Sequence, residues 1–280
     1  MRLSVITITR NEAHNVVDCL RSVSWADEII VVDSGSDDGT ADLARQFTPK
    51  VYIVPWQGYS ANKNFALAKA TGEWVLWLDA DERVAELLAR EIQSTLAADP
   101  AVAGFEIPRL AFFMGRWIRH GGWYPGRVVR LFRCGQGRFS DDPVHEGVVL
   151  SGPCGRLQHH LLHYTDLTLE HYLDKLNTYT TLSAHASLAK GRTVGLWEML
   201  ARPVHTFAKM YFFKAGFLDG IQGLILALLS AGHTFAKYAK IWHEGQQRHQ
   251  PSAQKLGLPI SAPAGEERRR RRSTGRSDLR

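Results

Sequence analysis

This chain has few of the features that mark disulfide-rich, zinc-binding or exported proteins. Its 280 residues include three cysteines, Cys19, Cys134 and Cys154. They are widely spaced and odd in number, so they define neither a disulfide framework nor a zinc site, and a reducing compartment fits best. The first residues have the pattern of a strand rather than the apolar stretch of a signal peptide. We therefore expect the protein to stay in the cytoplasm, where it is made.

The charges of the chain are also unevenly distributed along the sequence. The formal net charge is +6, but residues 244–280 hold nine Lys and Arg against four Asp and Glu, which leaves +1 for residues 1–243. The basic excess has no interleaved aromatics and no recognisable binding module, so we expect no nucleic-acid partner. No glycine fingerprint follows a strand, which excludes a nicotinamide dehydrogenase. We expect one catalytic unit with an extension, followed by a disordered basic tail over 244–280.

Short apolar runs alternate with helical patterns over the first part of the chain. Strands are expected at 3–8, 28–32, 51–54 and 74–78, and helices at 12–23, 38–47 and 61–70. This order predicts an α/β fold with a mainly parallel central sheet flanked by helices, which binds its ligands beyond the carboxyl ends of the strands. Residues 103–163 are richer in Gly, Arg and aromatics and are expected to add shorter, mixed strands to the sheet.

The C-terminal part has a helical pattern from Leu167, with a long segment from Trp197 to Trp242. Its most apolar stretch, Ile221–Ala231, is shorter than the roughly 18 apolar residues of a membrane-spanning helix. Aromatic and lysine residues surround this stretch, as in helices that lie on an anionic membrane surface. Two interpretations stay open: peripheral contact with a membrane, or a helical hairpin packed on the catalytic domain.

Two carboxylates directly after an apolar strand are the strongest chemical signal, in Glu73-Trp-Val-Leu-Trp-Leu-Asp79-Ala-Asp81-Glu82. Strand periodicity places Asp79 and Asp81 on one side. At that spacing they can hold Mg²⁺ or Mn²⁺, since such ions are usually bound by one or two carboxylates together with substrate phosphates. If this Asp-x-Asp pair stood alone, two solvated acids at a strand end would be the better interpretation. Whether it is a metal site therefore depends on the other motifs in the chain.

A second strand also ends in a carboxylate, in Val31-Val-Asp33-Ser-Gly-Ser36-Asp37. A carboxylate at this place can accept hydrogen bonds from a nucleobase or a ribose. Turn and helix-cap chemistry explains Ser36 and Asp37 equally well, but it explains the strand residue Asp33 less readily.

Three blocks together resemble a known family. Ser4–Glu12, Val31–Thr40 and Leu76–Glu82 occur in order at suitable separations, and over residues 1–100 the chain resembles family 2 glycosyltransferases of the GT-A fold. The resemblance implies a nucleotide-sugar donor such as UDP-glucose and a divalent metal, Mg²⁺ or Mn²⁺. The residues that it implies for the donor site are Thr9, Asn11, Glu12, Asp33, Ser36, Lys63, Asp79 and Asp81. For Lys63, a solvated lysine at a helix start is an equal alternative.

The same resemblance extends to the catalytic base and the metal. In Asp141-Asp142-Pro-Val-His145-Glu146 it places a general base for an inverting transfer at Glu146, with Asp141 and Asp142 as rivals and a structural loop acid as the alternative for each. In His159-His160-Leu-Leu-His163 it makes His163 an additional metal ligand beside Asp79 and Asp81. A strand would send His160 and His163 to opposite faces, and a lone histidine is often a core residue.

Residues 112–125 combine flat aromatics, arginines and glycines. Aromatic faces suit sugar rings, and Arg suits phosphate or carboxylate groups on an acceptor, although core packing explains some of these aromatics.

The whole order of blocks is similar to bacterial glycosyltransferases that extend the lipopolysaccharide inner core. That similarity implies an anionic glycolipid or polysaccharide acceptor and a place in the bacterial cytoplasm, with the inner face of the cytoplasmic membrane as a candidate docking surface. We expect a catalytic domain at 1–165, with a donor half at 1–100 and an acceptor half at 101–165, then a helical extension at 166–243. The alternatives are another lipid-linked or polysaccharide acceptor, or a non-catalytic, membrane-docked scaffold with the same fold.

Overall fold

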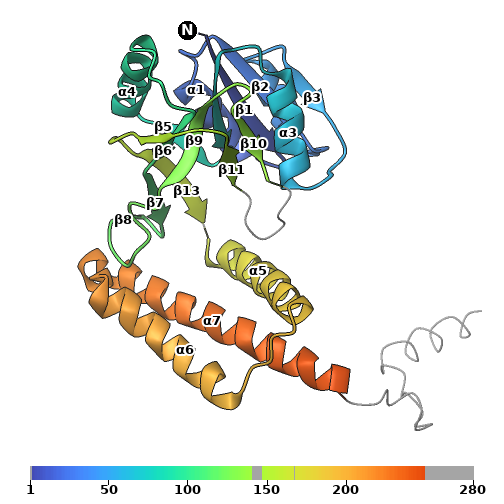
Figure 1. Cartoon of the computed structure of the whole chain (residues 1–280), viewed down its shortest axis with the longest axis vertical. Helices are drawn as coiled ribbons and strands as arrows, with labels where there is room; N and C mark the ends of the chain where they lie inside the picture. Colours follow the sequence, from blue (N-terminus) through green and yellow to red (C-terminus); the bar gives the residue numbers. More distant parts are fainter. Residues whose placement is uncertain (1, 141–146, 167, 250–280) are drawn as a thin grey trace, which may run out of the picture.

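The computed structural model describes residues 2–140, 147–166 and 168–249 (Figure 1). Its centre is a seven-stranded sheet in the order β12-β6-β9-β4-β1-β2-β3. The strands are β1 Leu3–Thr9, β2 Glu28–Asp33, β3 Val51–Ile53, β4 Trp74–Asp79, β6 Gly104–Ile107, β9 Val128–Arg133 and β12 Cys154–Arg156. Strands β3, β2, β1 and β4 are parallel, whereas β9 runs antiparallel to β4 and β6. The predicted α/β fold with a parallel sheet and a mixed extension is confirmed.

The parallel strands end together at one edge of the sheet. In the pairing of β1, Thr9 lies opposite Asp33 on one side, and Ile8 lies opposite Asp79 on the other. The polar residues that follow each strand in the sequence are therefore neighbours in space, although up to 70 residues separate them along the chain.

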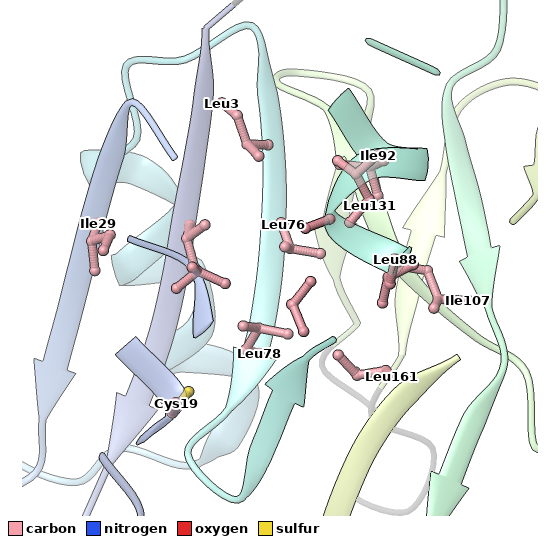
Figure 2. Packing of buried hydrophobic residues seen from close by; sticks show 14 of the residues in the cluster. Leu3, Cys19, Ile29, Leu76, Leu78, Leu88, Ile92, Ile107, Leu131 and Leu161 are labelled. Carbon is pink, nitrogen blue, oxygen red and sulfur yellow. The ribbon is translucent and has the colours of Figure 1, made fainter. Parts of the chain in front are cut away.

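Alternating side chains of the sheet enter two cores. On one face, Leu3 and Leu76 pack with α1 (Ala13–Ser22), α2 (Thr40–Arg45) and α4 (Glu86–Ala97), as Figure 2 shows for part of this cluster. On the other face, Ile6 and Trp77 pack with α3 (Tyr59–Lys69) and the hairpin of β10 (Gly137–Phe139) and β11 (Val148–Leu150). Because both faces are covered, the strands are apolar on both sides, as expected for a parallel sheet.

The amino-terminal edge of the sheet is held by a buried carboxylate. Glu28 begins β2 and accepts hydrogen bonds from the Ser4 hydroxyl and from the amide and hydroxyl of Thr71, at 2.9 and 3.0 Å. Lys50 forms an ion pair with it. Burial alone would raise the pKa of Glu28, but Lys50 and these hydrogen bonds lower it to about 2. Glu28 therefore ties four segments of the sheet together as a charged group.

A second sheet leads away from the first and carries part of the site. Its order is β5-β13-β7-β8, with β5 Glu82–Val84, β7 Arg109–Phe113, β8 Arg116–Ile118 and β13 Leu161–Asp166. Strand β13 pairs with β5 in antiparallel and with β7 in parallel orientation. It places residues from the predicted acceptor half beside the end of β4.

Below the sheets in Figure 1 lies the helical extension. It consists of α5 (Leu169–Ala189), α6 (Leu196–Ala208), a π-helical turn η1 (Lys209–Phe213), a 3-10 turn η2 (Gly216–Asp219) and α7 (Gly220–His249). The predicted segment 197–242 is thus folded into a hairpin of α6 and α7. A Cβ on Gly223 would lie 1.9 Å from the Gly216 carbonyl oxygen, so only glycine allows this close turn. Because α7 continues to His249, the expected start of the tail at 244 is too early.

The extension is joined to the sheets by polar and aromatic contacts. The buried Asp219 of η2 accepts hydrogen bonds from the backbone amides of Arg119 and His120. The ring of Phe113 packs against Trp123 and against Tyr172 of α5, at 6.0 and 5.9 Å between centroids. The stretch 112–125, in which we expected sugar-facing aromatics, therefore lies between the sheet and the extension.

Candidate active site

A cleft of about 1080 Å³ opens at the carboxyl ends of β1 and β4. Thr9 and Asp79, at the ends of these strands, and Asp81, in the turn after β4, line part of it. Residues of α5, including Lys175 and Tyr179, line it as well. The cleft is therefore shared between the α/β domain and the helical extension, at the edge of the sheet where the sequence pattern predicted a ligand site.

The loops after β1 and β2 are held together by Asp33. Its buried carboxylate accepts hydrogen bonds from the Thr9 hydroxyl (2.9 Å), the amides of Gly35 (3.1 Å) and Ser36 (2.8 Å), and the Ser36 hydroxyl (2.5 Å). The amide of Asn11, which has a positive φ of 56°, donates to Ser36 Oγ at 2.8 Å. These contacts fix the shape of both loops, and Asn11, Asp33 and Ser36 are not among the residues that line the cleft.

Two cations hold the first carboxylate of the Asp79-Ala-Asp81 motif. Arg130 Nη2 donates to Asp79 Oδ2 at 2.8 Å, and Lys63 Nζ lies 3.6 Å from Asp79 Oδ1. Both cations also lie over the Trp77 ring, at 3.4 and 4.2 Å from its centroid. Burial alone would raise the pKa of Asp79, but the charges of Arg130 and Lys63 hold it below its usual range. Asp79 is therefore ionised, and Lys63 is a buried residue of the cleft rather than a solvated lysine.

A second, fully buried acid supports this group from behind. Glu82 accepts a hydrogen bond from Arg130 Nη2 at 2.6 Å and from the Asp79 amide at 3.1 Å, and Arg109 lies 3.6 Å away. Burial raises the pKa of Glu82, and the charge of Arg130 opposes that rise. Within the described residues, Nε and Nη1 of Arg130 are buried without a hydrogen-bond partner. The hydrogen bonds and ion pairs of the Arg130 guanidinium are therefore made with the two acids that it bridges, Asp79 and Glu82.

The second carboxylate of the motif faces a histidine. Asp81 Oδ2 lies 3.3 Å from His163 Nε2, and both side chains are mostly buried, at 19% and 14% exposed. The Tyr164 amide donates to the Asp81 carbonyl at 2.8 Å and fixes β13 beside the turn. Strand β4 ends at Asp79, so Asp81 lies in the turn to β5. Asp79 and Asp81 line the same cleft, as expected, but strand alternation does not explain the position of Asp81, because the strand ends before it.

Glu12 lies where the α/β domain and α5 approach each other. Its carboxylate accepts a hydrogen bond from Asn15 Nδ2 at 2.9 Å, and its amide donates to Thr40 Oγ1 at 2.8 Å. Burial and the charge of Asp81 raise the pKa of Glu12, against the Asn15 hydrogen bond and the charge of Lys175. The charges of Asp81, at the sheet edge, and of Lys175, on α5, therefore both act on the Glu12 carboxylate.

Comparison with known proteins agrees with this geometry. The family model described as glycosyl transferase family 2 matches residues 4–141. The lipopolysaccharide core biosynthesis glycosyltransferase LpsC of Rhizobium meliloti is 32% identical over 254 residues, which cover 88% of this chain and 93% of that protein. The chain belongs to glycosyl transferase family 2. An uncharacterised glycosyltransferase of Rickettsia typhi is 26% identical over 252 residues, 86% of each chain.

One solved structure with the GT-A fold matches most of the chain. The mannosyltransferase PcManGT from Pyrobaculum calidifontis, solved with GDP-Man and Mn²⁺, superposes with a TM-score of 0.50 at 20% identity, covering 86% of each chain. This likeness shows the fold of the family 2 chain, and the predicted GT-A fold is confirmed.

In this family 2 glycosyltransferase, the cleft collects six of the predicted site residues: Thr9, Glu12, Lys63, Asp79, Asp81 and His163. The other three donor-site predictions, Asn11, Asp33 and Ser36, lie in the adjoining loops. Glu146, with its rivals Asp141 and Asp142, lies outside the described residues. The next residue along the chain, Gly147, lines the cleft.

Of the three clustered histidines, only His163 reaches the cleft. The ring of His160 packs against Tyr124 at 6.1 Å between centroids, and His159 lies 2.9 Å from Glu91 of α4. His159 and His160 therefore lie outside the cleft that His163 lines.

Sequence reasoning missed the buried pair of Arg130 and Glu82 and the residues contributed by α5. Arg130 stands within the apolar strand sequence Val128-Val-Arg-Leu-Phe, where a charge needs a buried partner. That pattern could have identified it. The residues of α5 gave no comparable signal, since only the tertiary fold turns that helix toward the sheet edge.

Proposed function

We propose that this enzyme transfers a hexose from a nucleotide-sugar donor, UDP-glucose or a close analogue, to a lipopolysaccharide core or similar envelope glycan. The main support is the placement of Asp81 beside His163 in the cleft that also holds Lys63, Asp79 and Glu12. The name of LpsC, a relative that matches most of the chain, supports the choice of acceptor.

The residues present fit a divalent metal. Adjacent ligands of an octahedral ion lie about 3 Å apart, and Asp81 Oδ2 and His163 Nε2 are 3.3 Å apart. No group of three His, Cys, Asp or Glu side chains suited to a metal occurs in the described part of the chain. We propose Asp81 and His163 as the protein's ligands for Mg²⁺ or Mn²⁺, with donor phosphate and water completing the shell. When bound, such an ion neutralises charge on the leaving diphosphate.

Asp79 was also predicted as a metal ligand, but its oxygens face Arg130 and Lys63. We propose that it contributes to the nucleotide site instead, held in place by Arg130. Lys63 then lies beside Asp79, where its charge can offset that of the diphosphate.

The transfer itself requires a base near the acceptor. We propose a single displacement in which an acceptor hydroxyl oxygen attacks the anomeric carbon as the bond to the diphosphate breaks. The hydroxyl proton goes to a carboxylate, and the configuration at the anomeric carbon inverts. Glu146 remains the predicted base. Its neighbour Gly147 lines the cleft, which supports this choice.

Donor hydrolysis tests the proposal. Purified protein should release nucleoside diphosphate from a nucleotide sugar in the presence of Mg²⁺ or Mn²⁺, and a panel of UDP- and GDP-sugars identifies the donor. Asp81→Asn should lower turnover at least about 100-fold with an unchanged melting temperature. The exposed Asp42→Asn on α2 is the matched control. Turnover of Asp81→Asn at the wild-type rate would remove Asp81 from the site.

Glu146→Gln should reduce transfer to acceptor about 100-fold or more while donor binding stays near wild type. Loss of donor binding with intact transfer chemistry would reject Glu146 as the base and return Asp141 and Asp142 to consideration.

We also propose that the enzyme works at the inner face of the bacterial cytoplasmic membrane. Exposed apolar residues, including Trp197, Val204 and Phe213 at 80%, 69% and 82% exposure, run along α6 into η1. Lys209 and Lys214 flank them. Apolar area combined with cations favours an anionic lipid surface.

One helical stretch of the described residues, Gly216–Gln247, is also long and apolar enough to cross a membrane. Those properties do not distinguish a span from a packed helix, and α7 packs here on α5 through Leu188, Tyr238 and Ile241. We therefore propose surface contact.

Vesicle sedimentation tests this part. Trp197→Ser with Phe213→Ser should reduce binding to anionic vesicles by about tenfold or more. Leu87→Ser on α4, an apolar residue that is 61% exposed, should not. Equal binding by all variants would contradict the assignment.

A further inference from the structure

A second pocket, of about 330 Å³, lies among the three helices of the extension. Four basic side chains line it: Arg202 and His205 of α6, and His233 and Lys237 of α7. The other lining residues carry hydroxyl groups, and no carboxylate lines it. Guanidinium, ammonium, imidazole and hydroxyl groups without an acid form a donor-rich surface, which suits an anion with several acceptor oxygens.

Positive charge is in excess around this pocket. Arg202 is paired with Glu198 at 3.1 Å, but Glu198 is shared with Arg192 at 3.4 Å. Across the described residues, Lys237 has no ion pair or hydrogen bond. Burial, together with the charges of Arg192 and Arg202, lowers the pKa of Lys237. The fold thus keeps a partly buried cation beside like charges, an arrangement that costs stability unless an anion joins it.

The pocket adjoins the active-site cleft. His233 lines both the pocket and the cleft. Between them, α5 presents Tyr172, Lys175 and Tyr179 to the cleft, residues at the helical spacing i, i+3 and i+7. Lys175 Nζ donates to the Thr165 carbonyl of β13 at 3.1 Å, which ties this face of α5 to the strand that carries His163. A ligand that reaches from the sheet edge toward the extension would meet aromatic rings first and then the cations of the pocket.

We propose that this cationic pocket binds a phosphate group on the acceptor side of the reaction, so that the helical extension anchors the acceptor while its sugar lies in the cleft. The role as acceptor anchor rests on the proposed function. Phosphate binding itself does not, and it can be measured without any sugar transfer. Phosphate carries three strong acceptor oxygens, which match donors arriving from separate helices.

Phosphate binding by the full chain tests the proposal directly. Isothermal titration with inorganic phosphate and with glucose 6-phosphate, each in the presence of EDTA, should give saturable binding to the wild type. Lys237→Gln should weaken the affinity about tenfold and Lys237→Glu further, because a charge-assisted hydrogen bond is lost. Lys190→Gln removes an exposed lysine of the extension that does not line the pocket and should leave the affinity unchanged.

Vesicles distinguish the source of the phosphate. Vesicles of phosphatidylcholine with phosphatidic acid are compared with phosphatidylcholine alone. Lys237-dependent binding of glucose 6-phosphate assigns the phosphate to the glycan, whereas Lys237-dependent binding confined to phosphatidic acid assigns it to a lipid headgroup.

The proposal is overturned if none of the three phosphate probes binds, or if Lys237→Gln and Lys190→Gln weaken binding equally. Donor hydrolysis by the wild type is measured in parallel. Absence of hydrolysis would contradict the proposed function, but the phosphate titration could still be interpreted. Intact hydrolysis without phosphate binding would contradict only the proposed phosphate site.

Discussion

In the α/β domain, Val5 and Leu76 are fully buried in the central sheet, whereas α6 in the extension contains no buried residue. Trp197 and Phe213 keep 80% and 82% of their surface exposed. The sheet packs apolar residues on both faces because helices cover it on both sides. The α6–α7 hairpin packs on one side and leaves its outer apolar stripe open.

The α/β domain and the extension also differ in how their charged side chains are paired. The buried charges of the α/β domain are matched within the chain: Glu28 with Lys50, and Arg130 with Asp79 and Glu82. In the extension, Lys237 has no counterion among the described residues. The α/β domain thus pairs its buried charges internally, whereas the extension keeps exposed apolar residues and a cation that is unpaired in the described part of the chain. The cleft lies where these two regions meet.

The largest expected effect on stability comes from Arg130. Arg130→Met leaves the buried Glu82 and the partly exposed Asp79 without this cation, so the free energy of unfolding should fall by about 3–5 kcal/mol in urea titrations. Adding Glu82→Gln should recover part of the loss. Arg138→Met, on the exposed side of β10, should change stability by less than about 0.5 kcal/mol. A loss below about 1 kcal/mol for Arg130→Met would show that the buried group is not a stabilising unit.

Matched leucine truncations compare the two regions directly. Leu76→Ala in β4 removes a fully buried side chain and should cost about 2–5 kcal/mol. Leu200→Ala in α6, where the side chain is 51% exposed, should cost less than about 0.5 kcal/mol. Chemical denaturation of both variants measures the difference. Equal costs would mean that the apolar stripe of α6 is covered within the folded protein.

The Glu28 contacts should depend on pH. The pKa of this carboxyl is about 2 in the folded chain against an ordinary value of 4.5, so its contribution is fully present above pH 4.5 and is lost as the pH falls toward 2. At pH 7 Glu28→Gln should cost on the order of 2–3 kcal/mol, and the gap from wild type should narrow by pH 3. Urea titrations at both pH values measure the gap, with exposed Glu86→Gln as control. A gap that stays constant with pH would contradict the assigned charge.

The smallest effect should be local to the junction. Asp219→Asn weakens the hydrogen bonds that the buried carboxylate accepts from Arg119 and His120, at a cost of about 1–3 kcal/mol. Amide hydrogen exchange should accelerate at these two residues and in η2, with little change in β1 and β4. The exposed Asp174→Asn on α5 is the control. Uniform acceleration through the sheet would show that the junction and the core unfold together.

Much of the fold was predictable from the sequence because its signals are local. Buried parallel strands have apolar runs, and the residues that follow them must meet at one edge of the sheet. This places Asp79 and Asp81 in the cleft without any coordinates. The sequence left two interpretations open for the aromatic residues at 112–125, because apolar rings suit either a ligand or a neighbouring helix. The structure packs Phe113 against Trp123 and against Tyr172 of α5.

Strand periodicity and motif order are properties of the chain, and they were enough to predict the α/β fold, its family and the residues at the sheet edge. How those residues pair depends on packing between distant segments. Asp79 turns to Arg130 and Lys63, and Asp81 to His163, because β4 ends between the two acids and β13 returns from far along the chain. The same long-range packing brought α5 to the cleft and gathered the cations of the extension into a pocket.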